Sequence, residues 1–321
     1  METASSAGAL RYAEPQYHQA EDLLRRGQLE MARQNGRLAP WRDYAVADSL
    51  LKQAYNLATE AANSAVRQRG DLHARAQFEC NDLRSDLKAW RAALDGSLNL
   101  YKAERYWSAA DLALRTSEGL IDKREYSAAL ETAAQGHDAL VKLSHVLDEY
   151  ANDEAQKIHV WRRWVRETVD GSRAAGTNAL VVDKAAHKLY LVQAGRMTRV
   201  FKCELGYNSA RQKFFSGDGA TPEGKYHITK KRPNGSKYYK ALMLSYPNET
   251  DKARFSQNKA RGIISRYARI GGLIEIHGDG GQHRDWTDGC VALTNDEMDA
   301  LMPHVAAGTP VTIVRRSDQW P

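Results

Sequence analysis

Glycine and proline are distributed so unevenly that the two parts of the chain must adopt different kinds of structure. Of the 23 glycines only 7 precede residue 171, and of the 8 prolines only 2 do. Because both residues interrupt helices and favour turns, the first part predicts long helices and the second predicts short elements joined by turns. The small-residue stretch 170–176 predicts the boundary. We therefore expect a helical bundle domain over residues 1–170 and a second domain over residues 177–315.

Charge follows the same division. Residues 1–170 carry a net charge of −3, from 23 basic and 26 acidic side chains, whereas residues 171–321 carry +9, from 23 and 14. The basic part predicts an anionic partner, and nucleic acid, acidic lipid and a polymer bearing carboxylates all satisfy that description.

Cysteine content and hydropathy argue against a disulfide-rich protein, a four-thiolate zinc protein and a protein with membrane-spanning helices. Three cysteines can form neither a disulfide framework nor a four-thiolate zinc site. No apolar run reaches the length of a membrane-spanning helix. The first ten residues lack the basic and apolar regions of a signal peptide, so we expect either a cytosolic protein or one whose targeting segment has been removed.

Apolar residues in the first part recur at steps of three and four. They predict amphipathic helices over residues 48–68, 74–100 and 126–150. An aromatic residue followed by small residues recurs at Tyr44, Tyr106 and Tyr126, as in stacked helical hairpins. The last two copies lie only 20 residues apart, which favours an irregular antiparallel bundle over a repeat array. Such a bundle can bind a protein partner or position the second domain, and both roles stay open.

Single histidines and cysteines of this part have simpler interpretations. His137 and His145 lie eight residues apart on predicted helices, and we interpret them as solvated or half-buried side chains rather than metal ligands. Cys80 is predicted to be a small core residue, as is Cys203 on a strand of the second part.

The second part predicts strands with glycine-rich connections and one helix. Thr294 and Glu297 have the spacing of a capping box, which predicts a helix start. Seven short strands favour a β-sandwich or barrel over a doubly wound sheet, so the fold class is α+β with two domains. The predicted strands cover residues 179–183, 188–192, 200–206, 225–230, 242–244, 273–277 and 310–314.

One glycine-rich loop resembles a phosphate-binding loop at residues 219–225. Tyr226 stands where such loops need a serine or threonine for magnesium, and Pro222 removes a backbone donor. We interpret this segment as a turn.

A second loop, residues 276–293, concentrates two histidines, three aspartates and Cys290 between a predicted strand and helix. In a first interpretation Cys290 is a nucleophile activated by a histidine, because an unassisted thiol is only a few per cent thiolate at neutral pH. Gly289 would let the backbone approach a substrate, and the turn 288–290 would offer N–H groups to an oxyanion. In a second, His277, Asp279, His283 and Cys290 bind zinc, although their spacing matches no strong signature. In a third, these residues are structural.

Three separated segments resemble the L,D-transpeptidase catalytic (YkuD) domain, and they occur in the order expected for that family. They are residues 216–226, 276–278 and 287–293. The stretch 236–248 is similar to members of the YafK-like branch. The resemblance spans about residues 177–315. It implies a mostly β sandwich that needs no cofactor or metal.

The resemblance also implies a substrate and its place. The substrate would be a peptidoglycan stem peptide, with no nucleic-acid partner. The protein would work in the periplasm or cell envelope after export, with a signal on the native N-terminus.

The resemblance further implies roles for individual residues. Cys290 would attack the carbonyl of an L,D bond next to diaminopimelate, with His277 as general base and His283 as the less favoured alternative. The backbone at Asp288, Gly289 and Cys290 would form the oxyanion hole. The acyl-enzyme would then pass to an amine or to water. Apart from the resemblance, we expect Tyr226, Trp286, His283, Arg284 and Gly278 to bind substrate, with core packing as the alternative for Tyr226 and Trp286. Arg284, Lys213 and Lys225 are candidates to hold a carboxylate, with a solvated charge as the alternative.

The chain departs from the common family pattern at two positions. Asp288 stands where many members carry a histidine, and Ala292 where they carry arginine or asparagine. A carboxylate beside the thiol raises its pKa if it points inward. These departures slightly favour hydrolysis, or transfer to an unusual acceptor, over ordinary transpeptidation. They also leave open a catalytically degenerate module that binds cell wall or a partner.

Overall fold

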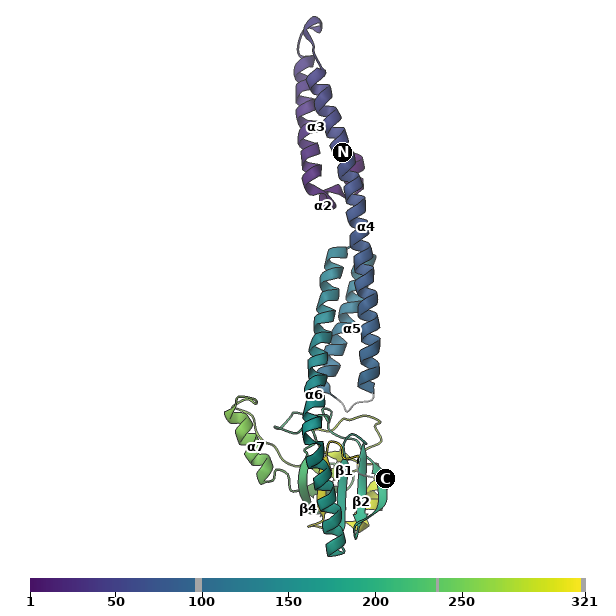
Figure 1. The fold of residues 1–321 in the computed structure, drawn as a ribbon, viewed down its shortest axis with the longest axis vertical. Helices are drawn as coiled ribbons and strands as arrows, with labels where there is room; N and C mark the ends of the chain where they lie inside the picture. Colours follow the sequence, from purple (N-terminus) through teal and green to yellow (C-terminus); the bar gives the residue numbers. More distant parts are fainter. Residues whose placement is uncertain (96–99, 235–236, 319–321) are drawn as a thin grey trace. The chain divides into compact units, whose positions relative to one another are not determined.

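The structure is a computed structural model that describes residues 1–95, 100–234 and 237–318. It comprises two compact units, Met1–Asp86 with Ala109–Asp138 and Leu87–Ser108 with Ala139–Pro321. Helices form the chain up to residue 175 and strands follow, which confirms the predicted α+β class (Figure 1). The helices of this region are α1 (Glu2–Ser6), α2 (Ala9–Tyr12), α3 (Glu14–Asn35), α4 (Ala45–Asp95), α5 (Tyr101–Asp122) and α6 (Tyr126–Ala175), with a 3-10 turn η1 at Ala39–Trp41.

Two helices that the sequence predicted separately form a single continuous helix in the structure. Residues 48–68 and 74–95 both lie in α4, because Gly70 between them is exposed and a lone glycine costs a helix only about 1 kcal/mol relative to alanine. The predicted segment 96–99 lies outside the described residues. The predicted linker also differs, since residues 170–175 form the last turns of α6, where the Ser172 hydroxyl bonds Thr177 O at 2.6 Å.

Alanines build the core of the first unit. Four buried alanines, Ala4, Ala9, Ala13 and Ala20, pack against α4. Their partners on α4 are the buried alanines Ala58, Ala61, Ala62 and Ala65. Because alanine projects only a methyl group, helix backbones approach closely there. Cys80 is buried as predicted and its Sγ lies 3.1 Å from Ser117 Oγ.

The strands of the second unit form one mixed sheet in the order β3-β2-β1-β8-β4-β5-β6-β7. The pairs β1–β8 and β6–β7 are parallel and the others antiparallel. β4 pairs with β8 through residues 224–227 and with β5 through residues 228–232, so the sheet curls along this strand. The strands are β1 (Asn178–Asp183), β2 (Lys188–Gln193), β3 (Arg196–Lys202), β4 (Gly224–Arg232), β5 (Ala241–Leu244), β6 (Glu275–His277), β7 (Val291–Ala292) and β8 (Pro310–Val314).

All seven predicted strands are present, although β3 begins four residues earlier than predicted and ends at Lys202. The predicted capping box is confirmed, because Thr294 and Glu297 bond each other's backbone at the start of α8 (Asn295–Leu301). The two-residue β7, the helix α7 (Glu249–Ala260) and the 3-10 turn η2 (Met302–His304) were not predicted.

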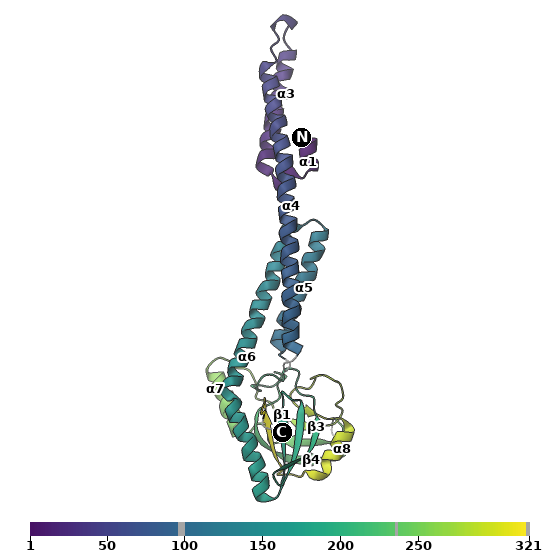
Figure 2. The same cartoon turned by 45° about the vertical axis from the view of Figure 1, so that its right-hand side comes forward.

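The C-terminal part of α6 packs against the sheet. Trp161 and Val165 are buried against Val181 of β1, Tyr190 of β2 and Val314 of β8. In Figure 2, α6 runs alongside the strands. These contacts make the C-terminal part of α6 a component of the second unit's core.

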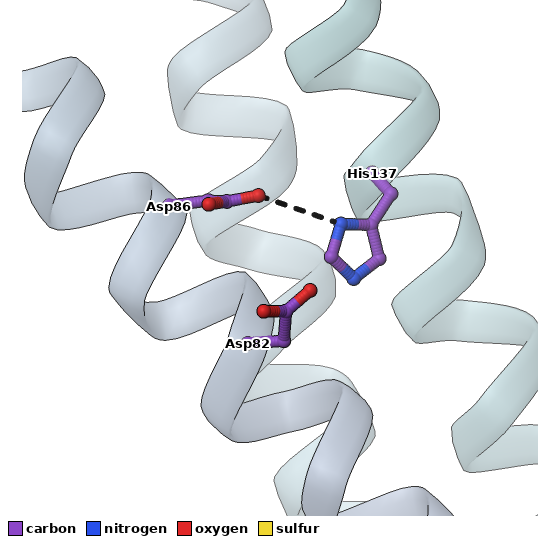
Figure 3. A group of neighbouring side chains, drawn as sticks. All are labelled: Asp82, Asp86 and His137. Carbon is purple, nitrogen blue, oxygen red and sulfur yellow. Dashed lines mark ion pairs between the residues drawn. The ribbon is translucent and has the colours of Figure 1, made fainter.

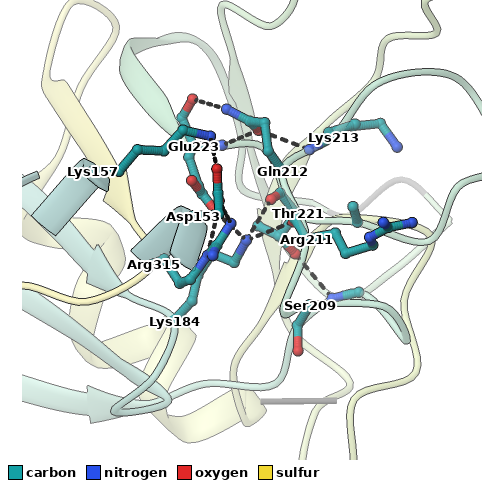
Figure 4. A network of polar contacts seen from close by, with 12 residues as sticks. Asp153, Lys157, Lys184, Ser209, Arg211, Gln212, Lys213, Thr221, Glu223 and Arg315 are labelled. Carbon is teal, nitrogen blue, oxygen red and sulfur yellow. Dashed lines mark hydrogen bonds and ion pairs between the residues drawn. The ribbon is translucent and has the colours of Figure 1, made fainter. Parts of the chain in front are cut away.

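A buried ionic network ties α6 to the sheet and to the loop before β4 (Figure 4). The Lys184 ammonium is fully buried and lies 2.9 Å from Glu223 Oε1, which also accepts from Arg315 Nε at 3.3 Å. Arg315 reaches Asp153 of α6 at 2.6 Å. Gln212 bonds the Glu223 backbone twice at 2.7 Å, so the network also fixes the segment that carries Lys213.

None of the helices in the described parts of the chain combines the length and apolar character that crossing a membrane requires.

Candidate active site

The pairing of β6 with β7 brings Cys290 and His277 together. Ile276 pairs with Val291 and His277 with Ala292 in parallel register, so Cys290 stands opposite Glu275. The Glu275 N–H lies 3.4 Å from Cys290 Sγ, in agreement with this register. Since side chains alternate along a strand, Glu275 and His277 share one face of β6. Cys290 precedes β7 and lies two register positions from His277.

His277 is held in a defined tautomer. Its Nδ1 lies 2.6 Å from Gly278 O, and because a carbonyl only accepts, Nδ1 carries the proton. Nε2 therefore presents a lone pair, and this atom is buried without a hydrogen-bond partner in the described structure. Burial lowers the pKa of His277 below its usual value, so the ring is neutral at pH 7. A neutral imidazole with a free lone pair has the properties of a general base.

Aromatic rings enclose this imidazole. Tyr238 stacks on His277 with 3.9 Å between ring centroids and 10° between planes, and Trp286 meets the imidazole edge-on at 5.9 Å. The Trp286 indole N–H donates to Glu204 Oε2 at 2.7 Å, and this bond holds the Trp286 ring in place. Trp286 thus lies beside the imidazole.

The resting thiol is a weak acid. Burial raises the pKa of Cys290 to about 11, with the Glu275 and Asp288 carboxylates contributing and Lys213 opposing. Besides the Glu275 N–H, Sγ contacts Leu273 O at 3.7 Å, and the residue is partly exposed. The thiol therefore needs a base to become nucleophilic at neutral pH.

Thr287 organises the turn before the nucleophile. Its hydroxyl accepts from Gly289 N–H at 3.2 Å and donates to Cys290 O at 2.7 Å. Of the three N–H groups expected in the oxyanion hole, that of Gly289 is therefore already used. Gly289 has φ +129°, and a Cβ there would lie 2.5 Å from Ala220 O, so only glycine fits.

A buried lysine lies under the same turn. Lys213 Nζ is 2.8 Å from Asp218 Oδ1 and 3.3 Å from Asp288 O, and it would lie 3.3 Å from a Cβ at Gly289. The Asp288 side chain itself is exposed. Lys213 is thus fixed within the structure instead of being a solvated charge.

Tyr226 and Gly278 have contacts that serve the packing of the domain. Tyr226 is only 5% exposed and its hydroxyl lies 3.3 Å from Asp251 Oδ1, so we do not keep it among the cleft residues. A Cβ on Gly278 would lie 2.5 Å from Asn295 Oδ1 and 2.6 Å from Tyr239 O, so this glycine permits close packing beside the imidazole.

The remaining predicted cations and His283 lie at the surface. His283 and Arg284 are exposed, and His283 N donates to Glu204 Oε1 at 2.6 Å. The Lys225 ammonium pairs with Glu167 of α6 at 3.0 Å.

The zinc interpretation lacks geometric support. Among the described residues, the group of metal-ligand side chains whose donor atoms all lie within 4.8 Å of one another is Asp82, Asp86 and His137 (Figure 3). His137 Nδ1 lies 3.9 Å from Asp86 Oδ2, and the ring is half-buried as predicted. The loop residues His277, Asp279, His283 and Cys290 form no such group.

The sequence interpretation missed Tyr238 as a wall of the site, and Glu275 and Thr287 as neighbours of the thiol. Alternation along the predicted strand 273–277 already places Glu275 on the face of His277. The Tyr238 contact depends on a loop conformation that no local pattern encodes.

Comparison with known protein families gives a match over the second unit. The family described as the L,D-transpeptidase catalytic domain (YkuD) matches residues 177–313. No curated protein matches the chain.

Several solved structures are similar to part of the chain. One is Bd1075 of Bdellovibrio bacteriovorus, with 23% identity, a TM-score of 0.33, and coverage of 44% of this chain and 50% of that one. Another is an L,D-transpeptidase from Mycobacterium smegmatis, with 14% identity, a TM-score of 0.29, and coverage of 43% and 58%. The chain thus spans little more than half the length of these structures. The family match takes in the strands and the Cys290 turn, so residues 177–313 are similar to an L,D-transpeptidase catalytic (YkuD) domain.

Proposed function

We propose that the chain catalyses cysteine-dependent acyl transfer on peptidoglycan stem peptides, at the L,D bond next to diaminopimelate. The observation that carries the proposal is the free Nε2 lone pair of His277, two register positions from Cys290. The family match supports the substrate class. The sequences of residues 236–248 and 289–294 are similar to the YafK-like branch, which supports placing the domain there.

The chemistry follows from these two groups. His277 Nε2 takes the thiol proton as Sγ attacks the peptide carbonyl, and the negative charge moves to the carbonyl oxygen. The N–H groups of Asp288 and Cys290 are the candidates to stabilise that oxygen, because Gly289 N–H bonds Thr287. As the C–N bond breaks, the imidazolium returns the proton to the leaving amine and a thioester remains. An amine or water then attacks the thioester and regenerates the thiol.

Water is the acceptor we favour. Ala292 provides no side-chain donor where many family members carry arginine or asparagine, so one contact available to an amine-bearing peptide is missing. Purified sacculi incubated with the protein, and with its Cys290→Ala variant, separate the two outcomes by mass spectrometry. Hydrolysis predicts cleaved stem peptides that are absent from the variant reaction, with the cross-linked dimers unchanged. New dimers that require Cys290 would instead establish transfer.

A second candidate is a catalytically degenerate module that binds cell wall or a partner. The observation in its favour is the thiol pKa of about 11. The structure also has no hydrogen bond between Cys290 Sγ and His277 within its described part. These features characterise a thiol that is not activated at rest.

Labelling by a carbapenem distinguishes the two candidates. An enzyme should form a covalent adduct on Cys290 within minutes, and His277→Ala should slow the reaction by about two to four orders of magnitude. His283→Ala is the matched control, because that exposed ring is the less favoured base. Labelling that is equally slow in the parent and in His277→Ala would support the binding module.

The location and domain roles complete the proposal. The proposed substrate lies in the bacterial periplasm and cell wall, so we propose that the protein works there after export. Residues 177–315 would form the catalytic domain and residues 1–170 an accessory domain that positions the substrate or binds a protein partner.

A further inference from the structure

The positive charge of the second part of the chain comes from one stretch. Residues 224–273, from β4 to the end of the loop after α7, hold 12 basic residues and two acidic ones, a net charge of +10. The whole of residues 171–321 carries +9, so this stretch accounts for all of the positive excess. The anionic partner that the sequence predicts is therefore expected to lie on a face that this stretch forms.

Two of these cations share a sheet face with His277. Arg232 of β4 pairs with Ala241 of β5, and Ala241 pairs with His277 of β6. Residues directly opposite each other in antiparallel strands project to the same face, so Arg232 and His277 lie on one face, two strands or roughly 10 Å apart. Lys230 lies on that face as well, because side chains two residues apart along a strand point the same way.

The same register leads to the thiol. Lys230 pairs with Met243 of β5, and Met243 pairs with Glu275 of β6. The Glu275 N–H in turn lies 3.4 Å from Cys290 Sγ. A ligand that extends from Cys290 across β5 would therefore meet Arg232 and Lys230.

The Arg232 guanidinium lacks an oxygen partner. Its Nη2 lies 3.2 Å from Met243 Sδ, and a thioether sulfur is a weak acceptor. Its Nε is buried without a hydrogen-bond partner. Within the part of the chain that the structure describes, this arginine forms no ion pair. A guanidinium held without an oxygen acceptor is costly for the fold, and a bound carboxylate would supply the missing acceptors.

Glu275 does not neutralise this arginine. The glutamate is 8% exposed, and burial raises its pKa against the opposing effect of Arg232, so its charged form is disfavoured. On the face that the described strands β4, β5 and β6 share, Lys230 and Arg232 stand against this one carboxylate. The face therefore keeps a positive charge even when Glu275 is ionised.

We propose that Arg232 binds the free carboxylate on the side chain of diaminopimelate while the scissile carbonyl lies at Cys290. The ligand class rests on the proposed function, and the place of the site rests on the register and contacts of Arg232. A guanidinium offers two parallel N–H groups to a carboxylate, which an ammonium cannot do. Arg232 thus selects the stem-peptide residue that lies at the nucleophile. It does so from the β5 side of His277, whereas Ala292 on the β7 side has no side-chain donor.

Calorimetry on the full chain with Cys290→Ala, taken as the parent, measures binding without catalysis. One probe is the tetrapeptide of L-alanine, γ-linked D-glutamate, diaminopimelate and D-alanine. Its twin carries an amide in place of the diaminopimelate side-chain carboxylate. The parent should bind the free acid at least about tenfold more tightly than the amide. This comparison needs no change at Arg232, so it does not depend on the folding of a variant.

Substitutions at the arginine then locate the preference. Arg232→Gln should bind both peptides with equal Kd values, close to the Kd of the parent for the amide. Arg232→Lys keeps the charge without the paired N–H groups and should retain only part of the preference. Arg199→Gln is the control, because it removes an exposed arginine from the edge strand β3, and its preference should equal that of the parent.

The proposal is overturned if the parent binds the two peptides equally or binds neither, or if Arg232→Gln keeps the preference. The carbapenem experiment on a chain with Cys290 intact tests the proposed catalysis separately. Labelling without a preference for the free acid would refute the role of Arg232 and leave the enzyme standing. A preference without labelling would refute the enzyme and leave the binding site standing.

Discussion

Tyr238 stacks face to face on His277, with 3.9 Å between the ring centroids. The same tyrosine meets Trp286 edge-on at 5.9 Å, so two aromatic rings enclose the imidazole. This enclosure is what makes His277 fully buried, and burial is the main cause of its lowered pKa. The loop after β4 therefore controls the basicity of a residue on β6.

Replacing this tyrosine should raise the pKa of the imidazole. In Tyr238→Ala water reaches the ring, the desolvation penalty on its charged form falls, and the pKa of His277 should move up towards 6.5. A histidine titration by NMR measures the shift. Tyr239→Ala is the control, because that side chain bonds Asp299 and does not stack on the imidazole. A pKa of His277 that stays or falls in Tyr238→Ala would refute the assignment of burial to this stack.

The protonation states predict a specific pH dependence for thiol alkylation. Burial raises the pKa of Cys290 to about 11 and lowers that of His277, so the resting pair at pH 7 is a neutral thiol and a neutral imidazole. Alkylation of Cys290 by iodoacetamide should therefore be slow at pH 7. Its rate should rise about tenfold per pH unit up to pH 10, because only the thiolate reacts. Mass spectrometry of the Cys290 peptide gives the rate, and a plateau below pH 8 would instead reveal a resting thiolate–imidazolium pair.

The pH dependence of turnover should follow the protonation of His277. The base must be unprotonated and burial lowers the pKa of His277, so kcat/KM should fall on acidification with a midpoint below 6.5. A pH–rate profile on stem peptides measures the midpoint. An acidic midpoint above 6.5 would argue against His277 as the base.

Lys213 should tune the thiol through its charge. The ammonium is buried beneath the Gly289 turn and lowers the pKa of Cys290 against the larger effect of burial. In Lys213→Met the pKa of Cys290 should rise further, and alkylation at pH 9 should slow several-fold. Lys225→Met removes an equal charge from an exposed pair and should leave alkylation unchanged. Faster alkylation in Lys213→Met would contradict the electrostatic role.

The parts of the site that depend on local sequence patterns could be predicted from the sequence. Alternation and turn residues predicted the strand that ends at His277, and the capping box predicted the start of α8 after Cys290. The stacking of Tyr238 on the imidazole could not be predicted, because it depends on the conformation of a loop distant in sequence from His277. The bond from Gly289 N–H to Thr287 could not be predicted either, because an irregular turn has no periodic pattern. The continuous α4 was missed since a single glycine looks like a boundary when packing is unknown.

The buried network at Glu223 should be the most sensitive ionic site of the second unit. Its carboxylate is 2% exposed and touches the Lys184 ammonium, which is fully buried, together with Arg315. Glu223→Gln leaves both cations without this partner, so we expect a loss of about 3–5 kcal/mol in the free energy of unfolding. Glu167→Gln, which breaks an exposed pair with Lys225, should cost less than about 1 kcal/mol.

The pH dependence of that loss has a definite sign. Burial acts to raise the pKa of Glu223, but Lys184 and Arg315 outweigh it and the net shift is downward. A carboxyl whose folded pKa lies below its unfolded value of about 4.5 stabilises the fold above that pH, and this contribution is lost as the pH falls through the folded pKa. Urea denaturation of parent and Glu223→Gln should therefore give a difference that is full at pH 7 and shrinks at pH values below 4. A difference that grows on acidification would show that Glu223 is protonated in the folded protein.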